Sequence, residues 1–310
     1  MPSPSKPIIV VCGATGTQGG SVINSLLQQS DKYHLRAITR NPDSKNAKEL
    51  EKKGVELIQG DLNKEDDLTR AFSNAYGVFA VTNYYDHSLK NHVQEEEQGK
   101  LIADVAKKMG VQHFIFSALE DAKEVSKGKY SKVYHFNGKA HVLEHIKKIG
   151  LPYTGVRIAY YYENNLGSLG PQKQEDGSYV FKSMFRPTTK VPMVSASMDI
   201  GPVVVQILAN REQYLGKTLD VTSEAYTIPE VTEIMAKVAG HPIKYQYVSP
   251  QELPKEIPFL ASNEDLREMF EYINDFGLFS GANIKESRIV GIKYLTFEEF
   301  LRKINWKLPQ

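Results

Sequence analysis

Three glycines near the amino terminus, Gly13, Gly16 and Gly19, are spaced so that they could bind a diphosphate. They follow the apolar run Ile8–Cys12 and precede residues 21–27, whose apolar side chains recur at helical spacing. In a strand–turn–helix unit of this kind, the first glycine lets the backbone reverse, the second admits a pyrophosphate, and the third lets the helix pack close to the strand. The free N–H groups at the helix start then face the phosphates. The stretch therefore predicts a dinucleotide site.

The residues after the second expected strand indicate which dinucleotide would bind. In such folds an acidic residue about 20 positions beyond the glycines binds the ribose 2′-hydroxyl of NAD. Here Thr39 stands at that position, Arg40 follows it, and Lys45 lies nearby. A guanidinium binds a 2′-phosphate through two charge-assisted hydrogen bonds, so the sequence favours NADP over NAD by roughly ten- to a hundredfold. In the alternative interpretation, Arg40 and Lys45 are solvated surface charges.

Two further groups of ionisable residues have spacings that suggest chemistry. His141, Glu144 and His145 match the H-x-x-E-H pattern of one class of zinc proteases. They continue an expected helix and would need a third ligand, so we expect no metal site. Two other charged groups are interpreted as solvated faces rather than binding patches: the run Glu95–Glu97, and the lysines Lys123, Lys127, Lys129 and Lys132.

Strand-like and helix-like segments alternate through the first half of the chain. This alternation predicts an α/β fold with a doubly wound parallel sheet, covered by helices on both faces. Ligands of such sheets collect at the carboxyl ends of the strands. After the opening unit, the expected strands span residues 35–39, 55–59, 77–81, 113–116 and 153–158, and the expected helices span residues 47–53, 68–74, 95–109 and 139–148.

Beyond about residue 160 the alternation loosens. Residues 167–192 are expected to form loops or a hairpin. Further helices are expected at residues 199–210, 228–240, 264–279 and 296–306, and strands at 218–222 and 244–248. We therefore expect a dinucleotide-binding domain in residues 1–158 and a smaller, discontinuous α+β domain in residues 159–310, with residues 199–222 returning to the first sheet.

The composition is that of an ordinary globular protein, with 41% hydrophobic and 24% charged residues among 310. Because 38 basic residues face 37 acidic ones, we expect no direct nucleic-acid partner. The single cysteine, Cys12, lies in the first apolar run and is interpreted as a small buried hydrophobe, which fits a reducing compartment. With no signal-peptide pattern and no run of roughly 18 apolar residues, we expect no membrane span and a cytoplasmic location, with a nuclear one also possible.

Several short motifs give the chain a likeness to a known family. They are Gly13–Gly19, Thr39-Arg40-Asn41-Pro42, Gly60-Asp61, Thr82-Asn83-Tyr84 and His135–Lys139, followed by Arg157 with Tyr162-Glu163-Asn164, Val191-Pro192-Met193 and Asp199-Ile200-Gly201-Pro202. With these motifs the chain resembles, over nearly its whole length, the NmrA-like family, an atypical branch of the short-chain dehydrogenases and reductases. It is most similar to members described as NADPH sensors, which bind the dinucleotide and pass its redox state to partner proteins.

The resemblance implies a Rossmann-type domain that binds NADP. The implied contacts are the glycine turn, the residues after the second, third and fourth strands, the lysine of the His135–Lys139 motif, and the sixth strand. By number these residues are Gly13, Thr15, Gly16, Thr17, Gln18, Gly19, Arg40, Asp61, Leu62, Thr82, Asn83, Tyr84, Lys139, Gly155, Val156, Arg157 and Ile158.

Hydride-transferring members of the wider superfamily carry a Tyr-x-x-x-Lys motif, in which the tyrosine is the general acid or base and the lysine holds the nicotinamide ribose. None of the 17 tyrosines here has a lysine four residues later, and the equivalent place reads His135-x-x-x-Lys139. Two interpretations stay open. In the first, Lys139 holds the cofactor and the protein is a sensor without turnover, acting through a protein partner or as a homodimer.

In the second interpretation the protein is an NADPH-dependent reductase of a quinone or small carbonyl compound, with Lys139 or His135 as its acid or base. An imidazole has a pKa suited to proton transfer near neutrality. The missing tyrosine favours the sensor.

Ser117 takes the place of the superfamily's substrate-orienting serine, or else its hydroxyl only satisfies the backbone. The lysines before Lys139 lie in a loop that could order over the cofactor as a redox-dependent switch; they are Lys123, Lys127, Lys129 and Lys132.

Overall fold

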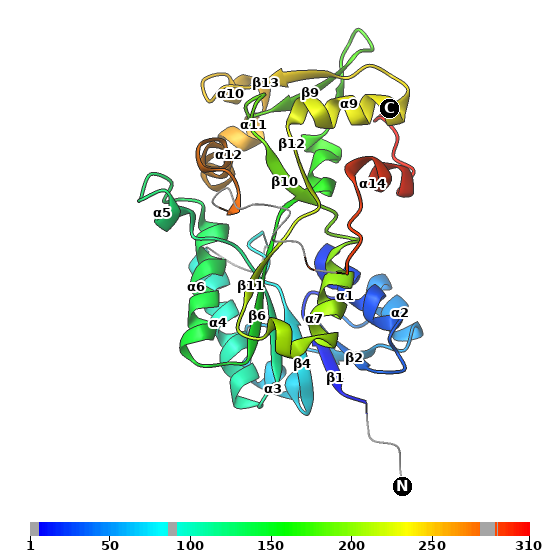
Figure 1. The fold of residues 1–310 in the computed structure, drawn as a ribbon, viewed down its shortest axis with the longest axis vertical. Coiled ribbons are helices and arrows are strands. Elements are labelled where there is room, and N and C mark those ends of the chain that lie inside the picture. The colour runs from blue at the N-terminus through cyan, green and yellow to red at the C-terminus, as the bar shows by residue number, and fades with distance from the viewer. Residues whose placement is uncertain (1–5, 86–91, 280–288, 290) are drawn as a thin grey trace. The chain divides into compact units, whose positions relative to one another are not determined.

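The computed structural model describes residues 6–85, 92–279, 289 and 291–310 (Figure 1). The chain divides into two compact units. The first unit comprises residues 1–119, 138–157 and 197–219, and the second comprises residues 120–137, 158–196 and 220–310. Residues 120–137, which we expected in the first domain, group with the second unit.

A seven-stranded sheet forms the centre of the first unit, with the strand order β11-β6-β5-β4-β1-β2-β3. Every neighbouring pair from β3 to β6 is parallel, as predicted for a doubly wound Rossmann-type fold. Because β1 lies between β2 and β4, the winding reverses beside β1, and open α/β sheets bind ligands at such a point. The strands are β1 (Ile8–Val11), β2 (His34–Thr39), β3 (Glu56–Gln59), β4 (Ala75–Ala80), β5 (His113–Ala118), β6 (Tyr153–Ile158) and β11 (Thr218–Val221).

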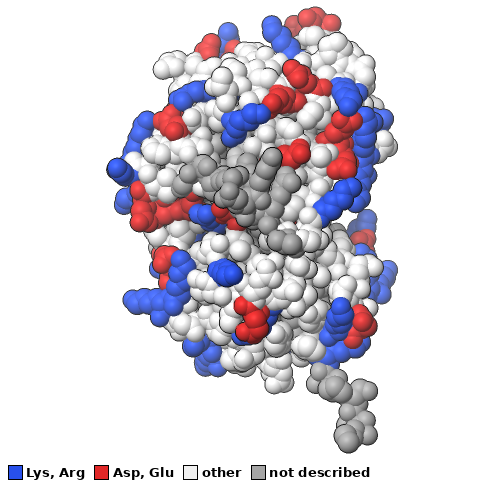
Figure 2. Space-filling view, in the orientation of Figure 1, with Lys and Arg blue, Asp and Glu red and all other residues white. Residues whose placement is uncertain are grey.

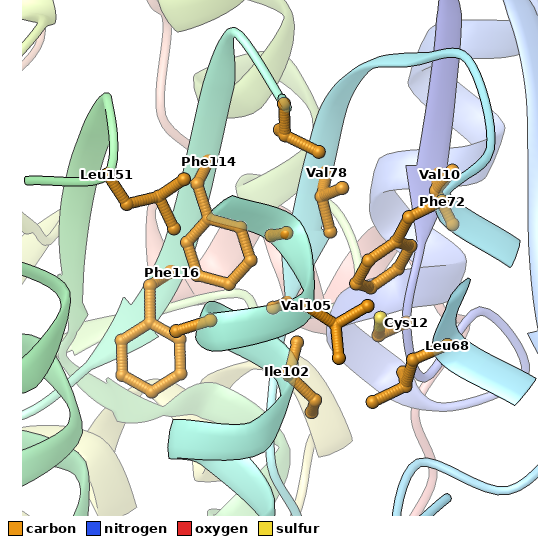
Figure 3. Packing of buried hydrophobic residues seen from close by; sticks show 14 of the residues in the cluster. Val10, Cys12, Leu68, Phe72, Val78, Ile102, Val105, Phe114, Phe116 and Leu151 are labelled. Atoms are coloured by element: carbon orange, nitrogen blue, oxygen red, sulfur yellow. The ribbon is translucent and has the colours of Figure 1, made fainter. Parts of the chain in front are cut away.

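Helices flank this sheet (Figure 1). Val10 and Cys12 point to one face, where they join Phe72 of α3, Ile102 of α4 and other residues in a buried cluster (Figure 3). The helices are α1 (Thr17–Leu27), α2 (Lys45–Lys52), α3 (Glu65–Phe72), α4 (His92–Lys108), α6 (Tyr134–Lys148), α7 (Ile200–Ala209) and α8 (Arg211–Tyr214).

Two elements of this region differ from the sequence prediction in ways that matter for the site. Helix α6 begins at Tyr134 rather than at residue 139, so His135 and Lys139 both lie within it. Its first turn is held by the carboxylate of Asp265, which accepts a hydrogen bond from the His135 backbone N at 3.1 Å, and local sequence does not reveal that contact. Strand β5 extends to Ala118, which places Ser117 inside the strand rather than after it.

The second unit holds two small sheets and several helices. One sheet has the order β12-β10-β7 and the other β13-β9-β8. In the second sheet β8 and β9 pair antiparallel, so residues 167–192 do contain a hairpin. The strands are β7 (Tyr160–Tyr161), β8 (Gln172–Lys173), β9 (Tyr179–Ser183), β10 (Val191–Val194), β12 (Glu224–Tyr226) and β13 (Lys244–Tyr247). The helices are α5 (Ala122–Val125), α9 (Ile228–Ala239), α10 (Leu253–Glu256), α11 (Pro258–Ala261), α12 (Glu264–Phe276) and α14 (Phe297–Lys303), with the 3-10 turns η1 (Tyr162–Asn165) and η2 (Gly167–Leu169).

Charged side chains of both signs are interspersed over the face drawn in Figure 2, and the net charge of the chain is +1. In the part of the chain that the structure describes, no helix is both long enough and apolar enough to cross a membrane.

Candidate dinucleotide-binding site

The glycine turn forms an open helix start at the point where the sheet winding reverses. Gly13 adopts a left-handed backbone conformation with a φ of 67°, and its carbonyl accepts a hydrogen bond from the Gly16 N at 2.9 Å. Gly16 is the N-cap of α1, so this helix start has no N-cap side chain that could accept a hydrogen bond from its N–H groups. Thr15, Gly16 and Thr17 are exposed. An uncapped, exposed helix start carries partial positive charge and free N–H donors, which suits a phosphate.

Gly19 explains how α1 can begin so close to the turn. A Cβ added to Gly19 would lie 2.1 Å from the carbonyl oxygen of Gly13, so only glycine fits there. The neighbouring residue Gln18 is buried. The predicted roles of Gly13 and Gly19 in shaping the turn thus agree with the geometry around them.

The segment after β4 lies beside this turn. The Cys12 N donates to the carbonyl of Phe79 at 2.9 Å, and a Cβ on Gly13 would lie 3.0 Å from Cγ1 of Val81. The next residue, Thr82, is buried, whereas Asn83 is exposed and accepts a hydrogen bond from the Tyr85 N at 3.1 Å. The rings of Tyr84 and Tyr85 pack edge to face. The structure therefore places Val81, the residue just before the predicted Thr82, Asn83 and Tyr84, against the glycine turn.

The ends of β2 and β3 form a second group of predicted residues. The Gly60 N donates to the carbonyl of Thr39 at 3.0 Å, so the exposed Arg40 and the turn at Asp61 adjoin. The Asp61 carboxylate accepts hydrogen bonds from the backbone and side chain of Asn63, each at 2.9 Å, and so shapes this turn. Leu62 packs against the core, and the exposed Lys45 is the first residue of α2. Since β2 pairs with β1, this edge is continuous with the glycine turn.

Lys139 is buried, with 8% of its surface exposed, and its ammonium forms an ion pair with Glu95 of α4. The same carboxylate oxygen accepts a hydrogen bond from the Thr82 hydroxyl at 2.6 Å. The interpretation of Glu95–Glu97 as a solvated run was therefore wrong for Glu95, which is 1% exposed. A signal in the sequence could have revealed this residue. Gly99, one helical turn after Glu95, is a glycine inside a long helix, and such a residue often marks close packing.

His135 has a different environment, in the second unit. Its Nδ1 lies 2.6 Å from Oδ2 of Asp265, and both side chains are buried. The imidazole thus helps to attach the start of α6 to α12, which gives it a structural role whatever its part in chemistry.

The predicted segment Gly155–Ile158 lies in β6. A Cβ on Gly155 would come within 3.1 Å of Leu143 and of the Thr218 hydroxyl, so this glycine allows α6 to pack on the sheet. Val156 and Ile158 are buried, and Arg157 is half-buried. Ser117 is 2% exposed and pairs with Val156 across the sheet. Ligand contacts from β6 stay a prediction.

Cys12 is fully buried, and burial raises the pKa of its thiol to about 12. The thiolate is the reactive form of cysteine, so this thiol is inert at neutral pH. The interpretation of Cys12 as a buried hydrophobe is confirmed.

The lysine-rich loop before α6 is attached to α12 in the second unit. Lys129 forms an ion pair with Asp275 at 2.6 Å, and Lys132 forms one with Glu264 at 2.5 Å. The hydrogen bond from Lys129, followed by those from Tyr130 and Arg186, lowers the pKa of the Asp275 carboxyl to about 2. Two of the four lysines of the expected switch are thus paired with carboxylates of α12.

Two other features lie away from the glycine turn. A cavity of about 670 Å³ at the amino ends of β4 and β5 is lined by Tyr76, Gln112 and residues 208–213. On α6, His141 pairs with Glu96 and His145 pairs with Asp104, at 2.8 and 2.7 Å. Among the described residues, no three His, Cys, Asp or Glu side chains come together as a metal site would need.

Comparison with known proteins gives these features a family. The model of the NmrA-like family matches residues 5–301. An NmrA-like family domain-containing protein of Dictyostelium discoideum is 32% identical, covering 97% of this chain and 98% of its own. The NmrA-like family domain-containing oxidoreductase ptmS of Penicillium ochrochloron is 29% identical, covering 87% of this chain and 84% of its own.

Solved structures agree with this match. NmrA, a negative transcriptional regulator, has been crystallised in complex with NAD and in complex with NADP. These structures superpose on the chain with TM-scores of 0.79 and 0.78, at 25% identity, and each covers 96% of this chain and 95% of its own. From the match over nearly its whole length and from this shared fold, the chain belongs to the NmrA-like family.

Proposed function

We propose that this protein binds NADP(H) at the carboxyl ends of β1, β2 and β4 and acts as a redox sensor through a protein partner or a second copy of itself. The main support is the exposed, uncapped start of α1 beside the residues that follow β4. NmrA, which shares the fold, has been crystallised with both NAD and NADP. The diphosphate would lie on the helix start, and the sugars would extend toward Arg40 on one side and Lys139 on the other.

Arg40 supports NADP as the preferred form, because this exposed residue directly follows Thr39, the position at which NAD-binding proteins carry a carboxylate. The Arg40→Ala variant should bind NADPH roughly ten- to a hundredfold more weakly, since it loses the charge-assisted bonds to the 2′-phosphate. Its affinity for NADH, which lacks that phosphate, should stay unchanged. Calorimetric titration with both nucleotides measures the two affinities.

Lys52→Ala is the matched control for Arg40→Ala, because Lys52 is an exposed cation in the last turn of α2. This control should bind both nucleotides like the wild type. Equal weakening of NADPH and NADH binding in Arg40→Ala would contradict the assignment of Arg40 to the 2′-phosphate.

The site chemistry supports a sensor over an enzyme. No tyrosine stands four residues before Lys139, and the imidazole that takes its place contacts the buried Asp265. Because the single cysteine is buried and inert, any redox response would come through the dinucleotide. A reducing compartment, the cytoplasm or the nucleus, suits this role. The test is to measure the sedimentation of the protein with NADPH and with NADP⁺, in each case with and without a candidate partner. We expect the assembly state of the NADPH-bound protein to differ from that of the NADP⁺-bound protein.

The second candidate is an NADPH-dependent reductase of a quinone or small carbonyl compound. Two facts favour it: Lys139 is retained, and ptmS is named an oxidoreductase. NADPH absorbance followed with a panel of quinones and aldehydes separates the two functions. We expect no turnover above the background rate. Turnover that disappears in Lys139→Ala or His135→Ala, but persists in the control His145→Ala, would replace the sensor proposal with the reductase.

A further inference from the structure

We infer that Glu95 is a positioning residue of the dinucleotide site, which holds the Lys139 ammonium and the Thr82 hydroxyl in place for the cofactor. This inference rests on the proposed binding of NADP(H). Glu95 is 1% exposed on α4, and one of its carboxylate oxygens contacts both partners. Through it, the end of β4, helix α4 and helix α6 meet at one buried charge.

Close helix packing brings the two charges together. A Cβ on Gly99 of α4 would lie 2.6 Å from Cγ2 of Val142 on α6, so the two helices approach as closely as a glycine allows. One turn earlier on each helix, Glu95 faces Gly138 and Lys139, and a Cβ on Gly138 would lie 3.7 Å from Oε2 of Glu95. The glycines thus leave room for a carboxylate and an ammonium between the helices.

The charges at this contact explain why Lys139 needs a partner. A buried ammonium without a counter-charge is strongly disfavoured, and the carboxylate of Glu95 supplies that charge. An ammonium has three N–H donors, and the Glu95 bond uses one of them. Because the Glu95–Lys139 pair as a whole is neutral, the remaining N–H donors of Lys139 suit the hydroxyls of a sugar better than a phosphate. The phosphates of the dinucleotide would instead bind at the helix start and at Arg40.

The second carboxylate oxygen strengthens the case for a functional role. Among the described residues, Oε2 of Glu95 is buried without a hydrogen-bond partner. A carboxylate kept only for stability would be expected to use both oxygens, because an unsatisfied buried acceptor is destabilising. Glu95 instead concentrates its contacts on the oxygen that binds Thr82 and Lys139.

The test measures NADPH affinity against pH for the wild type and for Glu95→Gln. Burial without a counter-charge favours the neutral amine over the ammonium, so Glu95→Gln should lose NADPH affinity as pH rises from 7 to 9 while the wild type changes little. At pH 7 the variant should already bind roughly tenfold more weakly. The affinity for NADH should fall by the same factor, since the pair serves the sugar that both nucleotides share.

Matched variants separate positioning from stability. Glu96→Gln removes a neighbouring carboxylate that pairs instead with Lys100 and His141, and it should leave NADPH binding and its pH profile unchanged. Glu95→Asp keeps the charge and should keep the flat pH profile at a lower affinity. In a double-mutant cycle, Glu95→Gln should add no further loss to Lys139→Met, because Glu95 acts through Lys139.

A Glu95→Gln variant with the affinity and pH profile of the wild type would overturn the inference, and so would additive losses in the double variant. If Glu95→Gln does not fold, Glu95→Asp and the double variant decide the outcome, since neither leaves the buried lysine unpaired. A wild-type protein that binds neither NADPH nor NADH would instead remove the proposed function, and the inference with it.

Discussion

The Gly19→Ala variant is expected to lose measurable NADPH binding and to have a free energy of unfolding lower by about 3 kcal/mol. The added Cβ would lie 2.1 Å from the carbonyl oxygen of Gly13, 2.5 Å from its carbon and 2.8 Å from the Ala14 N. These are backbone atoms, which cannot rotate away as a side chain could. Either α1 must move away from the turn or the turn must open, and both changes displace the N–H groups that would bind the diphosphate.

Gly20→Ala is the matched control for Gly19→Ala, because the same substitution one residue later meets no obstacle. Its Cβ would lie 3.6 Å from the carbonyl oxygen of Ala14, an ordinary van der Waals contact. Alanine also forms helix better than glycine by up to about 1 kcal/mol, so this variant should be as stable as the wild type or more so. Urea denaturation and NADPH titration measure both effects. Wild-type stability and affinity in Gly19→Ala would refute the close-packing account of the turn.

Acidification from pH 7.5 to pH 5 should destabilise the protein by about 2 kcal/mol through His113 alone. This histidine is fully buried in β5, its Nε2 lies 2.8 Å from the Thr154 hydroxyl, and burial, aided by the charge of Arg211, lowers its pKa from 6.5 to about 4. Below pH 6.5 the unfolded chain binds a proton that the folded protein does not accept. Stability is therefore lost as pH falls from about 6.5 to about 4, where the loss reaches about 3 kcal/mol.

His113→Gln isolates this contribution, because glutamine cannot titrate and can still reach a hydrogen-bond partner. Urea denaturation at several pH values between 4 and 7.5 should give a shallower loss of stability for the variant than for the wild type. Carboxylates with a lowered pKa, such as that of Asp275, become protonated only at lower pH, and their protonation lowers the free energy of unfolding equally in both proteins. Parallel stability curves for the two proteins would show that His113 is not the group responsible.

The sequence predicts the parts of the site that depend on neighbours along the chain. The turn at Gly13, Gly16 and Gly19 follows from three residue types at fixed spacing after an apolar run, and the structure forms it as expected. Arg40 follows from counting to the end of the second strand. Such features are local, because the strand, the turn and the helix each form from consecutive residues.

The parts that could not be predicted depend on residues far apart in the chain. Glu95 and Lys139 are 44 positions apart. Gly99 indicates that the helix of Glu95 packs closely against something, but it does not indicate that the partner of Glu95 is Lys139. The start of α6 depends on Asp265, which lies 130 positions from His135. Helix propensity and hydrophobic spacing carry no information about such partners.

Calorimetric titration of the purified wild-type protein with NADPH and with NADH tests the central claim most directly. For the wild type we predict one NADPH site per chain and an affinity for NADH that is lower by a factor of about ten or more. For Gly19→Ala we predict no detectable binding of either nucleotide. A wild-type protein that gives no saturable heat with NADPH, or a Gly19→Ala variant that binds as the wild type does, would contradict it.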